Sequence, residues 1–214
     1  GATTLSAVGC TFRSSQAATN GGVLYMEGGS AELRDCVVED AAADNGGAFQ
    51  LSGSSSLIVR GGRVGSCAAR TGGVLALAGG TAVFESVHFD GPSAATVHGG
   101  IVHQTGGTLE LTDCSLANAA AATGGAVSYT AGSARIRRTT IAACTATSGG
   151  GVSATAADLL VEDSVVRGCT TTGTGGSALA LRCPTADARR ALLALLAARR
   201  AEGAFVLLLD GRHA

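Results

Sequence analysis

A pair of adjacent glycines recurs at a nearly constant interval along this chain, and that interval limits what the chain can fold into. Successive pairs are 25, 26, 27, 25, 25 and 26 residues apart. The pairs are Gly21-Gly22, Gly46-Gly47, Gly72-Gly73, Gly99-Gly100, Gly124-Gly125, Gly149-Gly150 and Gly175-Gly176. A unit of this length buries a core only by stacking on copies of itself. The chain is therefore expected to form a solenoid of about seven coils.

Two columns of large apolar residues keep the same interval. One column consists of Phe12, Val38, Val64, Phe89, Leu116, Ile141 and Val166. The other consists of Leu33, Val59, Phe84, Leu111, Ile136 and Val161. Three columns in phase predict that equivalent residues of successive units lie side by side in one continuous core.

The residues after each glycine pair alternate in character, which is typical of a strand with one buried side. The third position after the first glycine is apolar, as in Leu24 and Phe49, whereas the next varies, as in Tyr25 and Gln50. Each unit has room for three short strands and three turns, but not for paired helices. Parallel pairing between units, with right-handed crossovers, predicts an all-β, right-handed, single-stranded parallel β-helix over residues 1–182.

The glycine pairs themselves are interpreted as structural corners. A sharp corner needs a positive φ or a missing Cβ, because a side chain there would collide with the neighbouring coil. The residue before each pair is polar, which predicts a ladder of hydrogen-bonding side chains: Asn20, Asn45, Thr71, His98, Thr123, Ser148 and Thr174. A phosphate-binding loop is the alternative, but no lysine and no following helix support it.

Composition removes several classes of function. The net charge is −1 and charged residues make up 14% of the chain, so neither nucleic acid nor an acidic membrane surface is an expected partner. No run of 18 apolar residues is present, so no transmembrane span is expected. The sequence begins at Gly1 in the middle of the repeat pattern, as expected of a fragment or a processed product.

The repeats resemble those of the chlamydial polymorphic outer-membrane proteins. Gly46-Gly47-Ala48-Phe49 and Gly124-Gly125-Ala126-Val127 match their Gly-Gly-Ala-Ile-type motif, and Phe12 and Phe89 match the aromatic end of their Phe-x-x-Asn motif. Ser15, Cys67, Cys144 and Cys169 stand where that motif has asparagine. The resemblance covers roughly residues 1–182 and extends more broadly to the pectin-lyase-like superfamily. It implies a cell-surface or extracellular β-helix, often adhesive.

Candidate ligand-binding residues lie on two outward faces. The strand after the glycine pair presents Tyr25 and His103 outward, and no carboxylate. On the second strand Arg135, Arg137 and Arg138 form a coil of arginines between acidic coils. Register places Glu110 opposite Arg135, Glu162 beside Arg137, and Asp113, Arg138 and Asp163 in one row. A salt-bridge ladder is favoured there over an arginine-lined site for a sulfated or carboxylated glycan.

Neither a metal site, a catalytic centre nor a cofactor is expected. His88, His98 and His103 lie within one unit, but His88 is next to a core phenylalanine and His98 is at a corner. Six of the seven cysteines fall into two columns, namely Cys10, Cys36 and Cys114, and Cys67, Cys144 and Cys169. Stacked thiols are favoured over disulfides, because side chains in register are about 4.8 Å apart and a disulfide needs Cβ atoms near 3.8 Å.

The repeat stops at Cys183, and residues 183–214 are predicted to form a helix followed by a strand. This segment is interpreted as a cap over the last coil or as the start of a following domain.

The leading functional hypothesis is a non-enzymatic surface or secreted scaffold that binds a glycan or a protein along its lateral faces. A polysaccharide lyase or hydrolase is one alternative, and it requires paired acidic groups in a cleft. An ice-binding β-helix is another, suggested only by Thr170-Thr171-Thr172 and Thr174.

Overall fold

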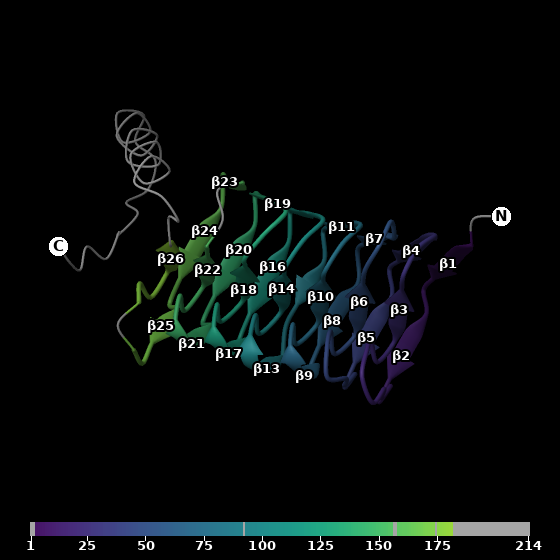
Figure 1. Ribbon diagram of the computed structural model, residues 1–214, viewed down its shortest axis with the longest axis horizontal. Helices are drawn as coiled ribbons and strands as arrows, with labels where there is room; N and C mark the ends of the chain where they lie inside the picture. Colours follow the sequence, from purple (N-terminus) through teal and green to yellow (C-terminus); the bar gives the residue numbers. More distant parts are fainter. Residues whose placement is uncertain (1–2, 92, 156–157, 174, 182–214) are drawn as a thin grey trace.

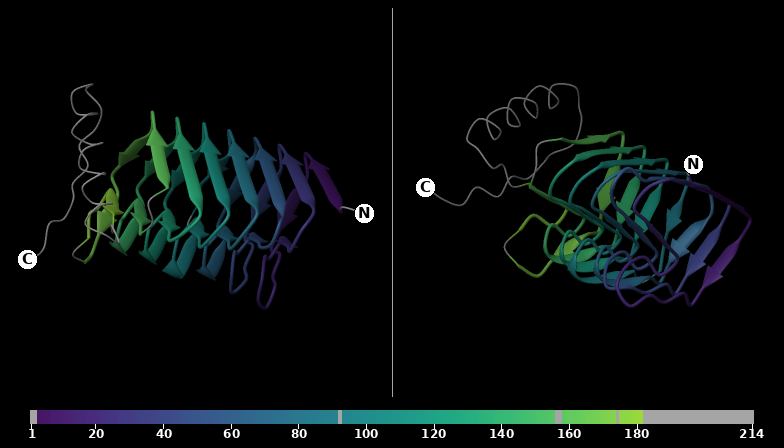
Figure 2. Two further views of the ribbon diagram at one scale, coloured as in Figure 1. Left: turned by 45° about the horizontal axis from the view of Figure 1, so that its top comes forward. Right: turned by 45° about the vertical axis from the view of Figure 1, so that its right-hand side comes forward.

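The chain winds into an elongated stack of coils, shown by a computed structural model that describes residues 3–91, 93–155, 158–173 and 175–181 (Figure 1). Strands from successive coils form three seven-stranded sheets and one five-stranded sheet, all with parallel pairing. Strands of one sheet follow one another along the long axis of the molecule (Figure 2). The architecture is the parallel β-helix that the interval between glycine pairs predicts.

Four sheets, here named A to D in chain order around one coil, make up the described stack. Sheet A contains β1 (Thr4–Val8), β4 (Ser30–Arg34), β7 (Ser56–Arg60), β11 (Thr81–Glu85), β15 (Thr108–Thr112), β19 (Ser133–Arg137) and β23 (Leu159–Glu162). Sheet B contains β2 (Thr11–Arg13), β5 (Val37–Glu39), β8 (Arg63–Gly65), β12 (His88–Phe89), β16 (Ser115–Ala117), β20 (Thr140–Ala142) and β24 (Val165–Arg167).

The other two sheets lie on either side of the glycine pair. Sheet C precedes it and contains β9 (Ala68–Thr71), β13 (Ala94–His98), β17 (Ala120–Thr123), β21 (Thr145–Ser148) and β25 (Thr170–Thr171). Sheet D follows it and contains β3 (Leu24–Met26), β6 (Phe49–Leu51), β10 (Leu75–Leu77), β14 (Val102–Gln104), β18 (Val127–Tyr129), β22 (Val152–Ala154) and β26 (Leu179–Leu181).

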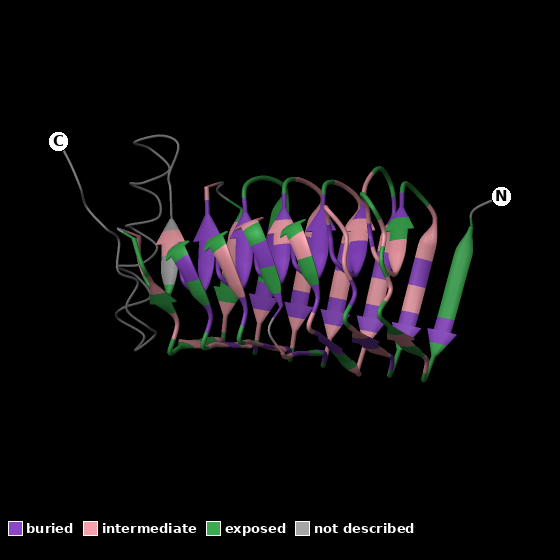
Figure 3. Ribbon diagram, turned by 90° about the horizontal axis from the view of Figure 1, so that it is seen from below, coloured by how far each residue is buried: buried purple, intermediate pink, exposed green. Residues whose placement is uncertain are grey.

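The apolar columns are confirmed as rows of residues in register. In sheet A, Leu33 pairs with Val59 and Phe84 pairs with Leu111. In sheet B, Phe12 pairs with Val38. Buried positions alternate with more accessible ones along most of these strands, as in β4, β7 and β11 (Figure 3). The core is therefore a thin interior that runs the length of the stack.

Aromatic rings pack against one another in this interior. The ring centroids of Phe84 and Phe89 are 5.2 Å apart in an edge-to-face arrangement, and Phe49 lies 6.5 Å from Phe84. One polar side chain, Gln104, is fully buried among the apolar residues. Its amide nitrogen donates to the carbonyl oxygens of Gly107 and Ser133, both at 3.0 Å, and so fixes the turn between sheets D and A.

The prediction of three strands in each coil is wrong for the middle and later coils, which have a fourth strand in sheet C. The missed segments are short and rich in alanine, as in Ala68–Thr71 and Ala120–Thr123. With so little contrast between their two faces, they show no period-two pattern. In the first two coils this segment forms only isolated bridges, such as Gln16 with Ala42.

The glycine pairs form the corners between sheets C and D, as predicted. In the first six pairs the first glycine has a positive φ between 49° and 66°. The second glycine packs on the next coil, and a Cβ on Gly47 would lie 2.1 Å from the carbonyl oxygen of Gly73. In the seventh pair, a Cβ on Gly175 would lie 2.5 Å from Ser148 Oγ. A side chain on the second glycine would therefore push neighbouring coils apart, whereas one on the first glycine of pairs such as Gly46-Gly47 would collide with a backbone carbonyl of its own coil, that of Phe49.

The predictions for residues 183–214 fall outside the described residues. Within the described part of the chain, no helix is long and apolar enough to cross a bilayer. The six cysteines in that part, from Cys10 to Cys169, are free.

Candidate functional site

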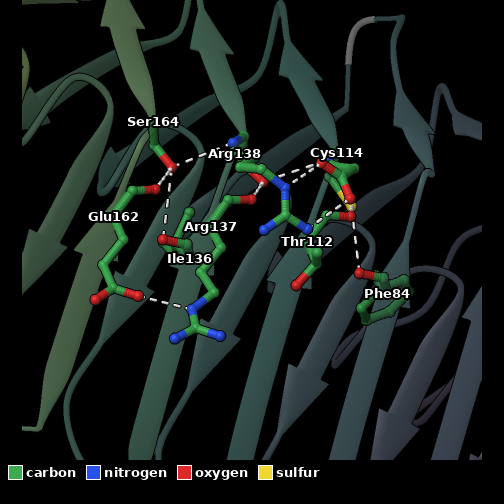
Figure 4. A network of polar contacts seen from close by, with 10 residues as sticks. Phe84, Thr112, Cys114, Ile136, Arg137, Arg138, Glu162 and Ser164 are labelled. Carbon is green, nitrogen blue, oxygen red and sulfur yellow. Dashed lines mark hydrogen bonds and ion pairs between the residues drawn. The ribbon is translucent and has the colours of Figure 1, made fainter.

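The coil of arginines lies on the outer face of sheet A and at the corner that follows it, and its side chains are paired with acidic neighbours. Arg137 Nε donates to Glu162 Oε2 at 2.7 Å on the next coil, as Figure 4 shows. Arg138 forms two hydrogen bonds of 2.7 and 2.8 Å with Asp113 on the preceding coil. Arg135 is 3.8 Å from Glu110. The predicted ion pairs are therefore present, each between adjacent coils.

These ion pairs determine the protonation and the net charge of the surface around the arginine coil. Hydrogen bonding to Arg138 lowers the pKa of Asp113, and the same contact raises the pKa of Arg138. Both groups stay charged at neutral pH, and each neutralises the other. An anionic glycan would have to displace these carboxylates before it could bind the guanidinium groups.

The same arrangement recurs nearer the N-terminus. On sheet A, Arg60 lies between Glu32 and Glu85, which belong to the preceding and following coils. On sheet B, Arg63 lies between Glu39 and Asp90 in the same way. The charged side chains of these two faces thus form ladders along the axis, and their charges are largely satisfied within the protein.

A different kind of surface lies where sheets C and D meet. We call it the inner corner, and it consists of the residue before each glycine pair and the outward residue three positions after the second glycine. In six coils these two-residue sets are Asn20 with Tyr25, Asn45 with Gln50, Thr71 with Ala76, His98 with His103, Thr123 with Ser128, and Ser148 with Ser153.

The outward faces of sheets C and D are directed toward each other at the inner corner. The imidazole rings of His98 and His103 stack with centroids 4.9 Å apart and an interplanar angle of 21°. Side chains that point away from the core are nevertheless buried there, since Ser128 is only 2% exposed and Ala76 only 6%. The angle between sheets C and D is therefore concave toward solvent.

The predicted polar ladder exists in the first coils of the inner corner. Asn45 Nδ2 donates to Asn20 Oδ1 at 3.2 Å, and Thr71 Oγ1 donates to Asn45 Oδ1 at 2.9 Å. Other polar atoms of the corner lack partners: Gln50 Oε1, in the same coil as Asn45, and His98 Nδ1 and His103 Nδ1, two coils farther along, are buried and form no hydrogen bond within the protein. The corner therefore holds polar atoms whose hydrogen bonds are not satisfied.

Burial also sets the ionisation of this site. Together with the neighbouring His98 and Arg70, burial lowers the pKa of His103 to about 4, against a hydrogen bond to the backbone of Ser128. His103 is consequently neutral at pH 7. Among the described residues that make up the inner corner, none carries a carboxylate, an ammonium or a guanidinium group.

The candidate residues Tyr25 and His103 both belong to the inner corner, three coils apart. Tyr25 is 44% exposed at the N-terminal end, and its hydroxyl donates to Glu27. The arginines belong instead to sheet A and to the corner that follows it, so the structure does not bring the two groups of candidates together.

The structure also places His98 against His103, a contact that sequence reasoning missed. The spacing of five residues across a glycine pair is the signal that could have found it.

His88 belongs to a different sheet from the other two histidines. It lies on sheet B, in register with Arg63 and Ser115, and not on sheet C or D. In the described part of the chain, no group of three or more histidine, cysteine, aspartate or glutamate side chains is arranged to hold a metal ion.

Comparisons with known proteins find no match to this chain. No protein-family model matches it, and no curated protein or solved structure shows significant similarity to it. The resemblance to the chlamydial outer-membrane repeats thus stays a prediction from short motifs.

Proposed function

We propose that this chain is a non-enzymatic β-helix scaffold, at a cell surface or secreted, that binds a neutral glycan along the inner corner. The observation that carries the proposal is the contrast between the two kinds of lateral surface. Charged side chains on sheets A and B pair with each other. At the inner corner, Gln50, His98 and His103 retain polar atoms without a partner.

The chemistry of the corner favours an uncharged, polar polymer. Its lining consists of hydroxyl, amide and neutral imidazole groups, which donate and accept hydrogen bonds without requiring a counter-charge. The rows repeat along the axis at about the 4.8 Å spacing of neighbouring strands. The small pairs Thr71 with Ala76 and Thr123 with Ser128 flank the two larger imidazoles. A regular, extended ligand such as a glycan fits this arrangement better than a compact molecule does.

Glycan-array binding with two double variants tests the proposal. Replacing His103 and Thr123 by alanine removes an aromatic face and a hydroxyl from the corner, and we expect at least a tenfold loss of affinity for neutral glycans. Replacing Arg137 and Arg138 by alanine should leave that affinity unchanged. Retained binding by the corner variant, or lost binding by the arginine variant, would overturn the assignment.

A turnover screen on neutral and uronic-acid polymers, run with the same proteins, separates binding from catalysis. Product formation by the parent protein would show an enzyme and replace the scaffold proposal. We expect binding without product.

A further inference from the structure

Two pairs of cysteines lie in register across neighbouring coils, one pair toward each end of the described stack. Cys10 and Cys36 lie in the first two coils, and Cys144 and Cys169 lie in two adjacent later coils. In each pair the residue after the second cysteine donates its backbone N–H to the carbonyl oxygen of the first. These bonds run from Val37 to Cys10 at 2.8 Å and from Thr170 to Cys144 at 2.9 Å.

The strands that flank both pairs are also in register. Val8 pairs with Arg34 before the first pair of cysteines, and Thr11 pairs with Val37 after it. Ala142 pairs with Arg167, and Thr145 with Thr170, around the second pair. Each pair of cysteine backbones is therefore held at the separation of adjacent parallel strands, about 4.8 Å.

The four thiols point in the same direction relative to their own strands. Each lies against the carbonyl oxygen two residues before it, at 3.5 Å for Cys10, 3.3 Å for Cys36, 3.3 Å for Cys144 and 3.6 Å for Cys169. The second thiol of each pair also reaches the preceding coil, where Cys36 Sγ is 3.6 Å from Ala7 O and Cys169 Sγ is 4.0 Å from Ile141 O. Equal side-chain directions in register keep the two sulfur atoms apart by roughly the strand spacing.

This separation between the two sulfur atoms suits a bridging metal ion better than a disulfide. A disulfide requires a sulfur–sulfur distance near 2.05 Å and Cβ atoms near 3.8 Å, closer than the strand spacing. A metal ion in line between two thiolates, with bonds no longer than the about 2.3 Å of zinc–thiolate bonds, holds the two sulfur atoms at most about 4.6 Å apart. Thiolates select soft ions, of which Cu(I) is the biological example.

We propose that Cys144 with Cys169, and Cys10 with Cys36, are two-coordinate sites for a soft monovalent cation of the Cu(I) type. Each ion would join adjacent coils through one thiolate from each. Binding exchanges two thiol protons for one Cu(I), giving a linear bis-thiolate with one net negative charge and two protons released to solvent. No electron transfer is involved.

A Cu(I) titration against a chromogenic chelator, under a non-thiol reductant, tests the proposal on the full chain carrying Cys183→Ser. We expect two Cu(I) ions per chain. Cys144→Ala with Cys169→Ala should bind one, and adding Cys10→Ser with Cys36→Ser should abolish tight binding. These replacements follow the repeat itself, because Ala119 and Ser164 occupy the equivalent corner positions. Circular dichroism of each variant checks that the fold is kept.

The isolated cysteines provide the matched control. Cys67 and Cys114 have no cysteine in register on either neighbouring coil, so Cys67→Ala with Cys114→Ser should still bind two ions. X-ray absorption of the loaded protein should show two sulfur neighbours at a single distance. Unchanged stoichiometry after loss of Cys144 and Cys169, a third ligand around the metal, or metal-induced dimers in size-exclusion chromatography would each overturn the proposal.

Discussion

At the corners that follow sheets A and B the backbone lies in the left-handed region in most coils, and many residues there are not glycine. After the strands of sheet A, Asp35, Ser86, Asp113, Arg138 and Asp163 have φ between 45° and 55°. After the strands of sheet B, Ser14, Asp40, Ser66, Asn118 and Ala143 have φ between 51° and 59°. Aspartate and asparagine tolerate this conformation because their short polar side chains bond locally. Arginine and alanine have no such compensation, so their corners are strained.

Ala143 is the cleanest place to measure that strain. Its φ is 52° and its side chain is exposed, so replacing it with glycine removes no buried contact. The left-handed conformation costs a non-glycine residue about 1–2 kcal/mol, and the greater freedom of glycine in the unfolded chain offsets about 0.4–1 kcal/mol of the gain. We expect Ala143→Gly to raise the free energy of unfolding by roughly 0.5–1 kcal/mol in urea denaturation. Ala142→Gly, in the adjacent strand β20, should lower it, and a loss of stability in both variants would contradict the strain.

The buried imidazole of His103 makes stability depend on pH. Its pKa is about 4 in the folded chain, mainly because of burial and then because of His98, and returns to about 6.5 on unfolding. As the pH falls, the unfolded chain binds this proton first. The stability that the neutral ring contributes is therefore complete above about pH 6.5 and is lost as the pH falls toward 4.

His103→Gln tests this dependence, because Gln50 occupies the equivalent position two coils earlier. Between pH 7 and pH 4.5 the parent should lose on the order of 1 kcal/mol more stability than the variant, allowing for the partial exposure of the ring. Chemical denaturation at both pH values gives the difference directly, and carboxylate titration cancels between the two proteins. Equal losses would show that His103 does not control the acid response.

At the scale of elements, the rows in register were predictable because each unit repeats the same apolar positions. Leu33, Val59 and Phe84 differ in size but keep one interval, and parallel stacking converts that interval into register. Sheet C was not predictable in this way, since Ala120-Ala121-Ala122 presents the same side chain to both faces. The concavity of the inner corner was missed as well. It depends on the backbone angle at the glycine pair, and residue identity shows only that such an angle is permitted.

The charge ladder on sheet A should protect the register of its strands more than it adds to stability. Arg60 lies between Glu32 and Glu85, so Arg60→Glu would place three carboxylates on neighbouring coils. We expect Arg60→Glu to lower the melting temperature at low ionic strength, and Arg60→Gln to lower it less. About 1 M NaCl should remove most of the difference between the two variants, because exposed charges are screened. A difference that persists in high salt would mean that the arginine acts through packing.

At the scale of the whole molecule, each coil contacts only the coils next to it, so stability is a sum over neighbouring pairs. A core residue in a middle coil supports two interfaces, whereas one in the first described coil supports only the interface that follows it. Phe84 is fully buried and packs against Phe49 and Phe89, which belong to an earlier coil and to its own. Phe12 is only half-buried, and its strand β2 pairs with β5 alone.

Replacing a phenylalanine by alanine should therefore have different consequences at Phe84 and at Phe12. Phe84→Ala should cost about 3–5 kcal/mol, the usual range for removing a buried aromatic ring. It should also increase amide hydrogen exchange in β7, β11 and β15 together, because the cavity weakens contacts on both sides of its coil. Phe12→Ala should cost less and accelerate exchange only in β2 and β5, leaving β15 protected. If Phe12→Ala loosened the distant coils as much as Phe84→Ala does, stability would be shared by the whole stack, and coupling between neighbours would not describe this protein.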